Sequence, residues 1–173
     1  LFGQAAKEPE LKADAEYYLG CLDFDQGDYT DAARHFALVT RASEANARVP
    51  YYMAQIYFAQ GSYDKALAEA RRFDGTKAED GEMLRIAGES LIKLGRQTDG
   101  VALLRSYLTK SSSPVASARY LVALADYDNG DYESALENLR PVAEGAEGAL
   151  QQSAYLFIGQ SLMHLGDSDS ALL

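Results

Sequence analysis

The residues of this chain that could do chemistry are few, and their spacing fits no familiar reaction. Neither histidine, His35 or His164, belongs to a His-x-x-x-His motif or to an acidic cluster that could hold zinc. Asp23, Asp25 and Asp28 resemble part of a calcium-binding loop, in which carboxylates alternate along the chain. Because a glycine and a tyrosine break that pattern, and a helix is predicted to run through it, we expect no metal site.

The motifs of nucleophilic and phosphate chemistry are also missing from the sequence. The single cysteine, Cys21, lies in a tyrosine-rich stretch without a basic neighbour, so we expect it to be inert. There is no glycine-rich phosphate loop, no Gly-x-Ser-x-Gly turn and no spaced catalytic triad. We therefore expect no cofactor, and we predict that the protein is not an enzyme.

The charge of the chain argues against nucleic acid as a partner. Among 173 residues, 26 are acidic and 16 are basic, which gives a net charge of −10, whereas phosphate binding needs clustered lysine and arginine. Charge is also uneven, since residues 116–151 hold two basic and seven acidic residues. No apolar run of about 18 residues is present, so we expect no membrane insertion.

Five glycines recur at a nearly fixed interval and indicate how the chain is organised. Gly27, Gly61, Gly95, Gly130 and Gly166 are separated by 34, 34, 35 and 36 residues. A period of this length is typical of a stacked helical repeat, in which each unit is a helix, a tight turn and a second helix. We refer to these five residues as the marker glycines.

The predicted repeats form one domain over residues 1–173. Their approximate bounds are 13–46, 47–80, 81–115, 116–151 and a truncated 152–173. Since the chain starts without methionine and stops inside a repeat, we expect it to be a fragment of a longer protein.

Small residues recur on both helices of each repeat and predict where the helices cross. Seven residues before the markers stand Gly20, Ala54, Gly88, Ala123 and Gly159. Five residues after them stand Ala32, Ala66, Gly100, Ala135 and Ala171. Two helices approach closely only where neither carries a bulky side chain, so these positions predict the helix–helix contacts.

Turn and proline chemistry predicts the helix ends. Each marker glycine should end the first helix in the left-handed conformation. The next residue should cap the second helix, as at Asp28, Ser62, Asp131 and Asp167, whereas Arg96 predicts a less well-defined turn. Pro50 fits a first helical turn, and Ser113-Pro114 should begin another helix. Pro141 should kink or end its helix before a loose linker at residues 145–148.

These residues resemble the tetratricopeptide repeat. Its Leu-Gly, aromatic, Ala and Phe pattern is matched by Leu19-Gly20 and by residues 27–36, and its second half by residues 61–67 and 130–136. The family's tryptophan is absent. The resemblance implies an all-α, right-handed superhelical solenoid whose first helices line a concave peptide-binding groove. The paired tyrosines at residues 17–18 and 51–52 resemble bacterial cell-envelope members, which implies a periplasmic or envelope location, with the cytoplasm as the alternative.

The positions that match the family's groove are the candidate binding residues. They are Tyr17, Phe24, Arg48, Tyr51, Gln55, Phe58, Arg85, Glu89, Tyr120, Leu124 and Tyr127. In the last repeat the same offsets include Gln160, Met163 and His164. Exposed aromatic side chains give a peptide large contact area at low entropic cost. The alternative is that these rings pack between neighbouring helices, and that the arginines pair with Glu82 and Glu89.

The resemblance predicts a scaffold or adaptor that binds a protein or peptide segment. Two alternatives are a self-associating structural module and the non-catalytic arm of a larger enzyme. Tyr155, Phe157, Ile158 and Leu162 lie on the helix of the truncated repeat and need covering. We therefore expect a dimer through this C-terminal end.

Overall fold

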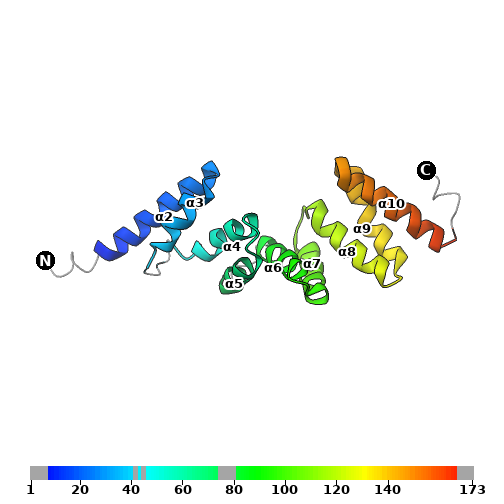
Figure 1. Cartoon of the computed structure of the whole chain (residues 1–173), viewed down its shortest axis with the longest axis horizontal. Helices are drawn as coiled ribbons and strands as arrows, with labels where there is room; N and C mark the ends of the chain where they lie inside the picture. The colour runs from blue at the N-terminus through cyan, green and yellow to red at the C-terminus, as the bar shows by residue number, and fades with distance from the viewer. Residues whose placement is uncertain (1–7, 41–42, 44–45, 74–80, 167–173) are drawn as a thin grey trace. The chain divides into compact units, whose positions relative to one another are not determined.

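The computed structural model describes residues 8–40, 43, 46–73 and 81–166, and in these residues all regular structure is α-helical (Figure 1). The chain divides into two compact units, residues 1–90 and 91–173. The fold is an all-α helical repeat of the solenoid class.

The first unit contains two helix pairs and most of a fifth helix. Its helices are α2 (Glu8–Gln26), α3 (Tyr29–Ala37), α4 (Val49–Ala59), α5 (Tyr63–Arg72) and α6 (Gly81–Lys93), whose last three residues belong to the second unit. Helix α2 packs against α3, α4 packs against α5, and α4 also contacts α2 and α3 (Figure 1).

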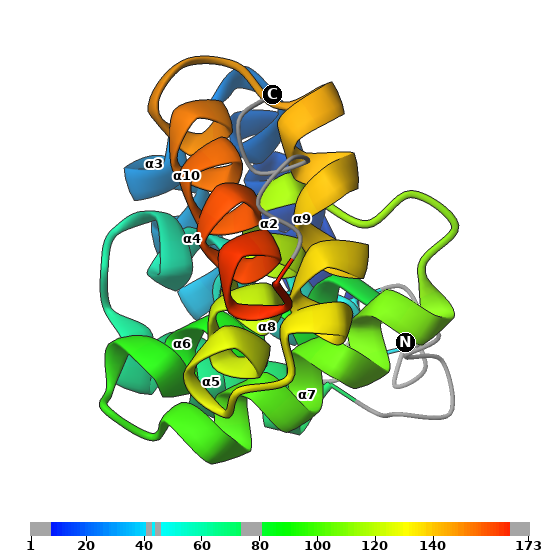
Figure 2. The same cartoon turned by 90° about the vertical axis from the view of Figure 1, so that its right-hand side faces the viewer.

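The second unit has the same alternation of first and second helices. Its helices are α7 (Gln97–Lys110), α8 (Ala116–Asp128), α9 (Tyr132–Gly145) and α10 (Gly148–His164). Helix α9 contacts both α8 and α10, which also contact each other, and α7 packs against α8 (Figure 2). One core cluster of this unit contains Ala123, Ala135, Leu139, Val142, Ala143 and Ala154.

The marker glycines end the first helices as predicted. All five have positive φ angles, between 72° and 83°. In the four fully described turns, the N–H after the glycine donates to a carbonyl five residues back, at 2.8–2.9 Å. The turn at Arg96 has this bond too, at 2.8 Å to Leu91, so the expectation that this turn is less defined is wrong. The bond joins backbone groups, and the Arg96 side chain instead pairs with Asp99.

The predicted N-cap residues lie at the expected positions, but not all of them form a side-chain hydrogen bond to the helix. Asp131 caps α9, because its carboxylate accepts the Ser134 N–H at 3.1 Å. Asp28 and Ser62 precede their helices without a side-chain cap bond, although their backbone angles resemble those of Asp131. Asp167 lies outside the described residues.

The predictions from the prolines agree only in part with the helix ends that the structure shows. Pro50 lies in the first turn of α4, as expected. Helix α8 begins at Ala116 rather than at Ser113-Pro114, because Val115 is extended and its N–H donates to the Tyr107 hydroxyl at 3.0 Å. Helix α9 continues through Pro141 to Gly145, since the residues that follow the proline are buried, and only two residues separate it from α10.

The small residues lie at the helix crossings as predicted. Ala32, Ala54, Ala66, Ala123 and Ala135 are completely buried. At Gly20, an added Cβ would lie 2.7 Å from Cε1 of Phe36, so α3 approaches α2 as closely as the missing side chain allows. Ala171 lies outside the described residues.

Candidate functional site

The aromatic side chains of the first unit form a packed cluster where one repeat meets the next. Phe36 on α3 stacks on Tyr52 of α4, with ring centroids 5.2 Å apart. Phe24 and Tyr17 on α2 approach the same Tyr52 ring at 5.0 and 6.2 Å. Tyr17 is only 7% exposed and belongs to the core with Phe36. Of the two interpretations of Tyr17, the structure therefore agrees with packing, and this ring offers a ligand almost no surface.

The pKa values of two phenol groups in this cluster are raised. Burial raises the pKa of Tyr17, and a hydrogen bond with Cys21 raises it further. The pKa of Tyr52 is also raised, mainly by burial and then by the neighbouring Cys21. These phenols are therefore neutral structural groups, and Cys21 lies between them as a packing residue.

The second unit repeats this arrangement of rings. Phe157 on α10 occupies the place of Tyr52 and lies 6.2 Å from Tyr120 and 5.1 Å from Tyr127. Tyr127 also packs against Tyr132 at 5.4 Å. Tyr120 and Tyr127 are only partly buried, and both pack on the edge of the aliphatic core.

A pocket of about 300 Å³ opens beside these rings, between α8 and α10. It is lined by Tyr127, Gln160, Met163 and His164, which are all positions that the family's groove predicted. The His164 ring stacks on Tyr132, with centroids 4.4 Å apart and an interplanar angle of 1°. Met163 is 67% exposed. This pocket offers an aromatic ring, an amide and a polarisable thioether to one ligand group.

The candidates on α4 are partly buried and partly paired. The Arg48 guanidinium lies 4.8 Å from the centre of the Tyr51 ring, a cation–π distance. Tyr51 also packs against Phe73 at 5.7 Å, and the Gln55 amide donates to the Tyr51 carbonyl at 3.4 Å. Arg48 itself is exposed at the start of the helix.

The guanidinium of Arg85 is saturated by acidic side chains of its own helix. It donates to Glu82 at 2.8 Å and to Glu89 at 3.0 Å, and it lies 5.3 Å from the Phe58 ring centre. The hydrogen bond to Glu82 is the largest cause of the raised pKa of Arg85. The side chain is 15% exposed, so pairing on the helix surface describes Arg85 and Glu89 better than contact with an acidic ligand.

One ionic cluster was not anticipated from the sequence. His35 on α3 lies between two carboxylates of α2, with Nδ1 2.6 Å from Glu16 and Nε2 3.5 Å from Asp23. The sequence did not indicate these ion pairs, because the two helices bring together residues far apart in sequence. Among the described residues, no group of histidine, cysteine or carboxylate side chains has the arrangement of a metal site.

The helix of the truncated repeat is better covered than the sequence suggested. Leu162 is buried, and Phe157 and Ile158 pack on the core of the second unit. Of the four predicted side chains only Tyr155, at 55%, is among the exposed large apolar residues, together with Leu156 at 58% and Met163. In the described part of the chain, no helix has the length and apolar character needed to cross a membrane.

Comparison with known proteins agrees with this geometry. Two family models described as Tetratricopeptide repeat match residues 23–87 and 120–173, which together make up more than half of the chain. The chain belongs to the tetratricopeptide-repeat family. Members of this family are generally non-catalytic modules of protein interaction, so the class of protein defined here is an interaction scaffold. No curated protein matches the chain at a significant level.

Solved structures share the fold at low sequence identity. A MamA crystal structure has a TM-score of 0.68 and 18% identity, over 93% of this chain and 86% of that one. YrrB, described as a tetratricopeptide-repeat protein with an unusual peptide-binding site, has a TM-score of 0.72 and 18% identity, over 99% and 87%. MamA from Desulfovibrio magneticus RS-1, from residue 41 to its end, has a TM-score of 0.68 and 16% identity, over 93% and 89%.

Proposed function

We propose that this protein is a scaffold that binds a peptide or protein segment along its first helices, with the pocket between α8 and α10 as the main contact in the second unit. The observation that supports the proposal is the convergence of Tyr127, Gln160, Met163 and His164 on one opening of about 300 Å³. A ring, an amide and a flexible thioether suit an apolar side chain of a partner that has a polar backbone nearby.

The structure narrows the candidate residues on physical grounds. Tyr17 is buried, and Arg85 and Glu89 neutralise one another, so we give these three no direct contact with the partner. The remaining candidates are partly exposed, and they are Phe24, Arg48, Tyr51, Gln55, Phe58, Tyr120, Leu124 and Tyr127. The peptide-binding site named for YrrB supports the choice of a peptide, since both chains have the same fold.

A selection of random displayed peptides on the full chain tests the proposal. We expect enriched peptides to bind the Met163→Ala and Gln160→Ala variants roughly tenfold more weakly or worse. Tyr155→Ala is the matched control, because Tyr155 is exposed on the same helix but does not line the pocket. Failure to enrich any peptide, or equal binding by both pocket variants and the parent chain, would contradict the proposal.

A second candidate function is self-association through the exposed face of α10. Tyr155 and Leu156 are both more than half exposed, and neighbouring apolar side chains of this size tend to be covered by a partner. Under this candidate, light scattering should give a dimer mass that Leu156→Asp reduces to the monomer mass. A monomer at all accessible concentrations would eliminate it and leave peptide binding unaffected.

A further inference from the structure

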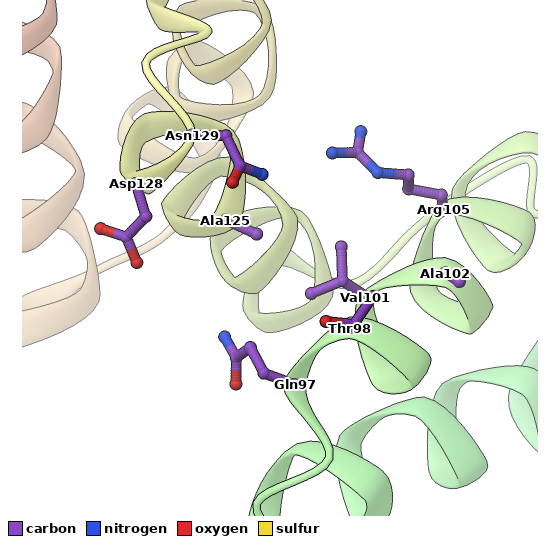
Figure 3. Close-up of a pocket in the computed structure, with 8 residues that line it drawn as sticks. All are labelled: Gln97, Thr98, Val101, Ala102, Arg105, Ala125, Asp128 and Asn129. Carbon is purple, nitrogen blue, oxygen red and sulfur yellow. The ribbon is translucent and has the colours of Figure 1, made fainter.

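A second cleft in the same unit lies between the first turns of α7 and the end of α8 (Figure 3). Its volume is about 350 Å³, which is at the lower end of the range for ligand sites. Its lining residues are Gln97, Thr98, Val101, Ala102, Arg105, Ala125, Asp128 and Asn129. The size suits one long side chain of a partner better than a whole small molecule.

The walls of this cleft divide into an apolar floor and a polar rim. Val101, Ala102 and Ala125 provide the floor, and Figure 3 shows Val101 between the two helices. The rim residues are Gln97 and Thr98 from α7, and Asp128 and Asn129 from the end of α8. Among the residues that the structure describes, no side chain hydrogen-bonds to the side chains of these four. Each rim side chain carries an oxygen that can accept a hydrogen bond.

The positive charge at the edge of the cleft is already neutralised. Arg105 forms an ion pair with Asp126, which is 2% exposed and also accepts a hydrogen bond from Asn138. An anionic ligand that recruited Arg105 would leave the Asp126 carboxylate buried without its counter-ion, which is strongly unfavourable. The cleft is therefore a poor site for a carboxylate or phosphate.

The remaining charge on the rim is negative. Asp128 is exposed and pairs with no described cation, so it is the one lining charge without a counter-ion among the described residues, whereas Arg105 pairs with Asp126. A field of this sign attracts cationic groups and repels anionic ones.

We infer that the cleft between α7 and α8 binds a lysine or arginine side chain of a partner segment. The aliphatic stem lies on Val101, Ala102 and Ala125, as long basic side chains cover apolar surface elsewhere. The charged head donates to the Asp128 carboxylate, and its remaining N–H groups donate to side-chain oxygens of the rim, since a lysine ammonium has three donors and an arginine guanidinium five. This site uses none of the residues that line the pocket between α8 and α10, so it stands independently of the proposed function.

The direct test is a titration of the isotopically labelled full chain with three blocked tripeptides, followed by amide NMR shifts. The probes are acetyl-Ala-Lys-Ala-amide, its norleucine analogue with a similar stem and no charge, and its glutamate analogue. We expect saturable shifts at Thr98, Ala125 and Asn129 with the lysine probe. The norleucine probe should bind about tenfold more weakly, because it lacks the charge-assisted hydrogen bonds. Absence of saturable shifts with lysine, or equal binding of the glutamate probe, overturns the inference.

Matched variants separate this site from general attraction to an acidic protein. Asp128→Asn should weaken lysine binding about tenfold, whereas Glu133→Gln, which removes an exposed charge nearby in sequence, should change it less than about twofold. Equal losses in both variants would show unspecific attraction and overturn the inference.

Two further variants complete the design. Thr98→Lys, which places a fixed cation at the rim, should abolish binding, and it provides a second route if Asp128→Asn alters the fold. Met163→Ala should leave lysine binding unchanged. A negative result for the cleft between α7 and α8 is therefore distinguishable from a negative result for the pocket between α8 and α10. Unchanged binding in both Asp128→Asn and Thr98→Lys overturns the inference.

Discussion

The two units contain the same set of rings in different surroundings. At equal distances from the marker glycines, the rings are Tyr17, Phe24, Tyr29 and Tyr52 in the first unit, and Tyr120, Tyr127, Tyr132 and Phe157 in the second. The distances between ring centroids agree closely. Phe24–Tyr52 and Tyr127–Phe157 are 5.0 and 5.1 Å apart. Tyr17–Tyr52 and Tyr120–Phe157 are both 6.2 Å apart. Recurring aromatic residues therefore join neighbouring repeats in both units.

The difference lies in the residues around the rings. In the first unit Gly20 leaves room for Phe36, whereas the equivalent pair in the second unit is Ala123 and Leu139. At the other edge, His164 stacks on Tyr132 where the first unit has Ala59. In the first unit, the large core residue Phe36 packs against the rings. In the second unit, the surface ring of His164 is added beside them. The recurring rings therefore account for the contacts between neighbouring repeats. Whether a binding surface forms depends on the residues that lie beside these rings.

The largest expected loss of stability comes from removing the Phe36 ring of the first unit. Phe36→Ala should reduce the free energy of unfolding by about 3–5 kcal/mol, because Phe36 is 2% exposed and stacks on Tyr52. Urea unfolding followed by circular dichroism measures it. Leu38→Ala, at an exposed site just after the same helix, should change stability by less than about 0.5 kcal/mol. A small effect of Phe36→Ala would mean that the rings do not share one core.

The difference between the Gly20–Phe36 pair and the Ala123–Leu139 pair can be tested by a double-mutant cycle. Gly20→Ala should destabilise by about 1–3 kcal/mol, because the new Cβ would lie 2.7 Å from the Phe36 ring. The loss should be smaller in a Phe36→Leu background, which reproduces the Ala–Leu pair of the second unit. Additive effects in unfolding experiments would show that the two positions are not coupled.

The His164 ring of the second unit should contribute less to the free energy of unfolding. His164→Ala should cost about 0.5–1.5 kcal/mol at most, since the stacked pair lies at the surface. Differential scanning calorimetry would measure this change, with the exposed Tyr155→Ala on the same helix as the control. A loss as large as that of Phe36→Ala would remove the distinction between the two sets.

The smallest effect at neutral pH concerns the buried phenol of Tyr17 in the first unit. The pKa of Tyr17 is raised on folding, so its contribution is fully present below the unfolded pKa of about 10 and is lost as pH rises above it. Tyr17→Phe should therefore lose less stability than the parent chain as the pH rises above about 10. Parallel pH dependences of the two proteins in urea titrations would contradict the burial of this hydroxyl.

The sequence predicted what depends on local chemistry. The marker glycines and the small residues at the crossings were sufficient for the helix pairs, because left-handed turns and close approaches tolerate few other side chains. The pairing of Arg85 with Glu82 and Glu89 was predictable for the same reason, since these residues are three and four positions apart on one helix.

Features that depend on residues distant in sequence were not predictable. Tyr17 and Tyr120 occupy equivalent positions, and their different burial follows from Phe36 and Leu139 on other helices. The cleft between α7 and α8 was missed because Thr98 and Asp128 each resemble an ordinary solvated turn residue. Only the packing of the two helices brings them to one opening.

The pairing of each helix with its neighbours has a consequence for how fast the protein folds. The helix contacts described within each unit join helices that are adjacent or next but one along the chain. Proteins with such a low contact order fold in microseconds to milliseconds, because little chain entropy is lost before a contact forms. During synthesis, α2 and α3 can therefore dock as soon as both have left the ribosome, before the second unit has been translated.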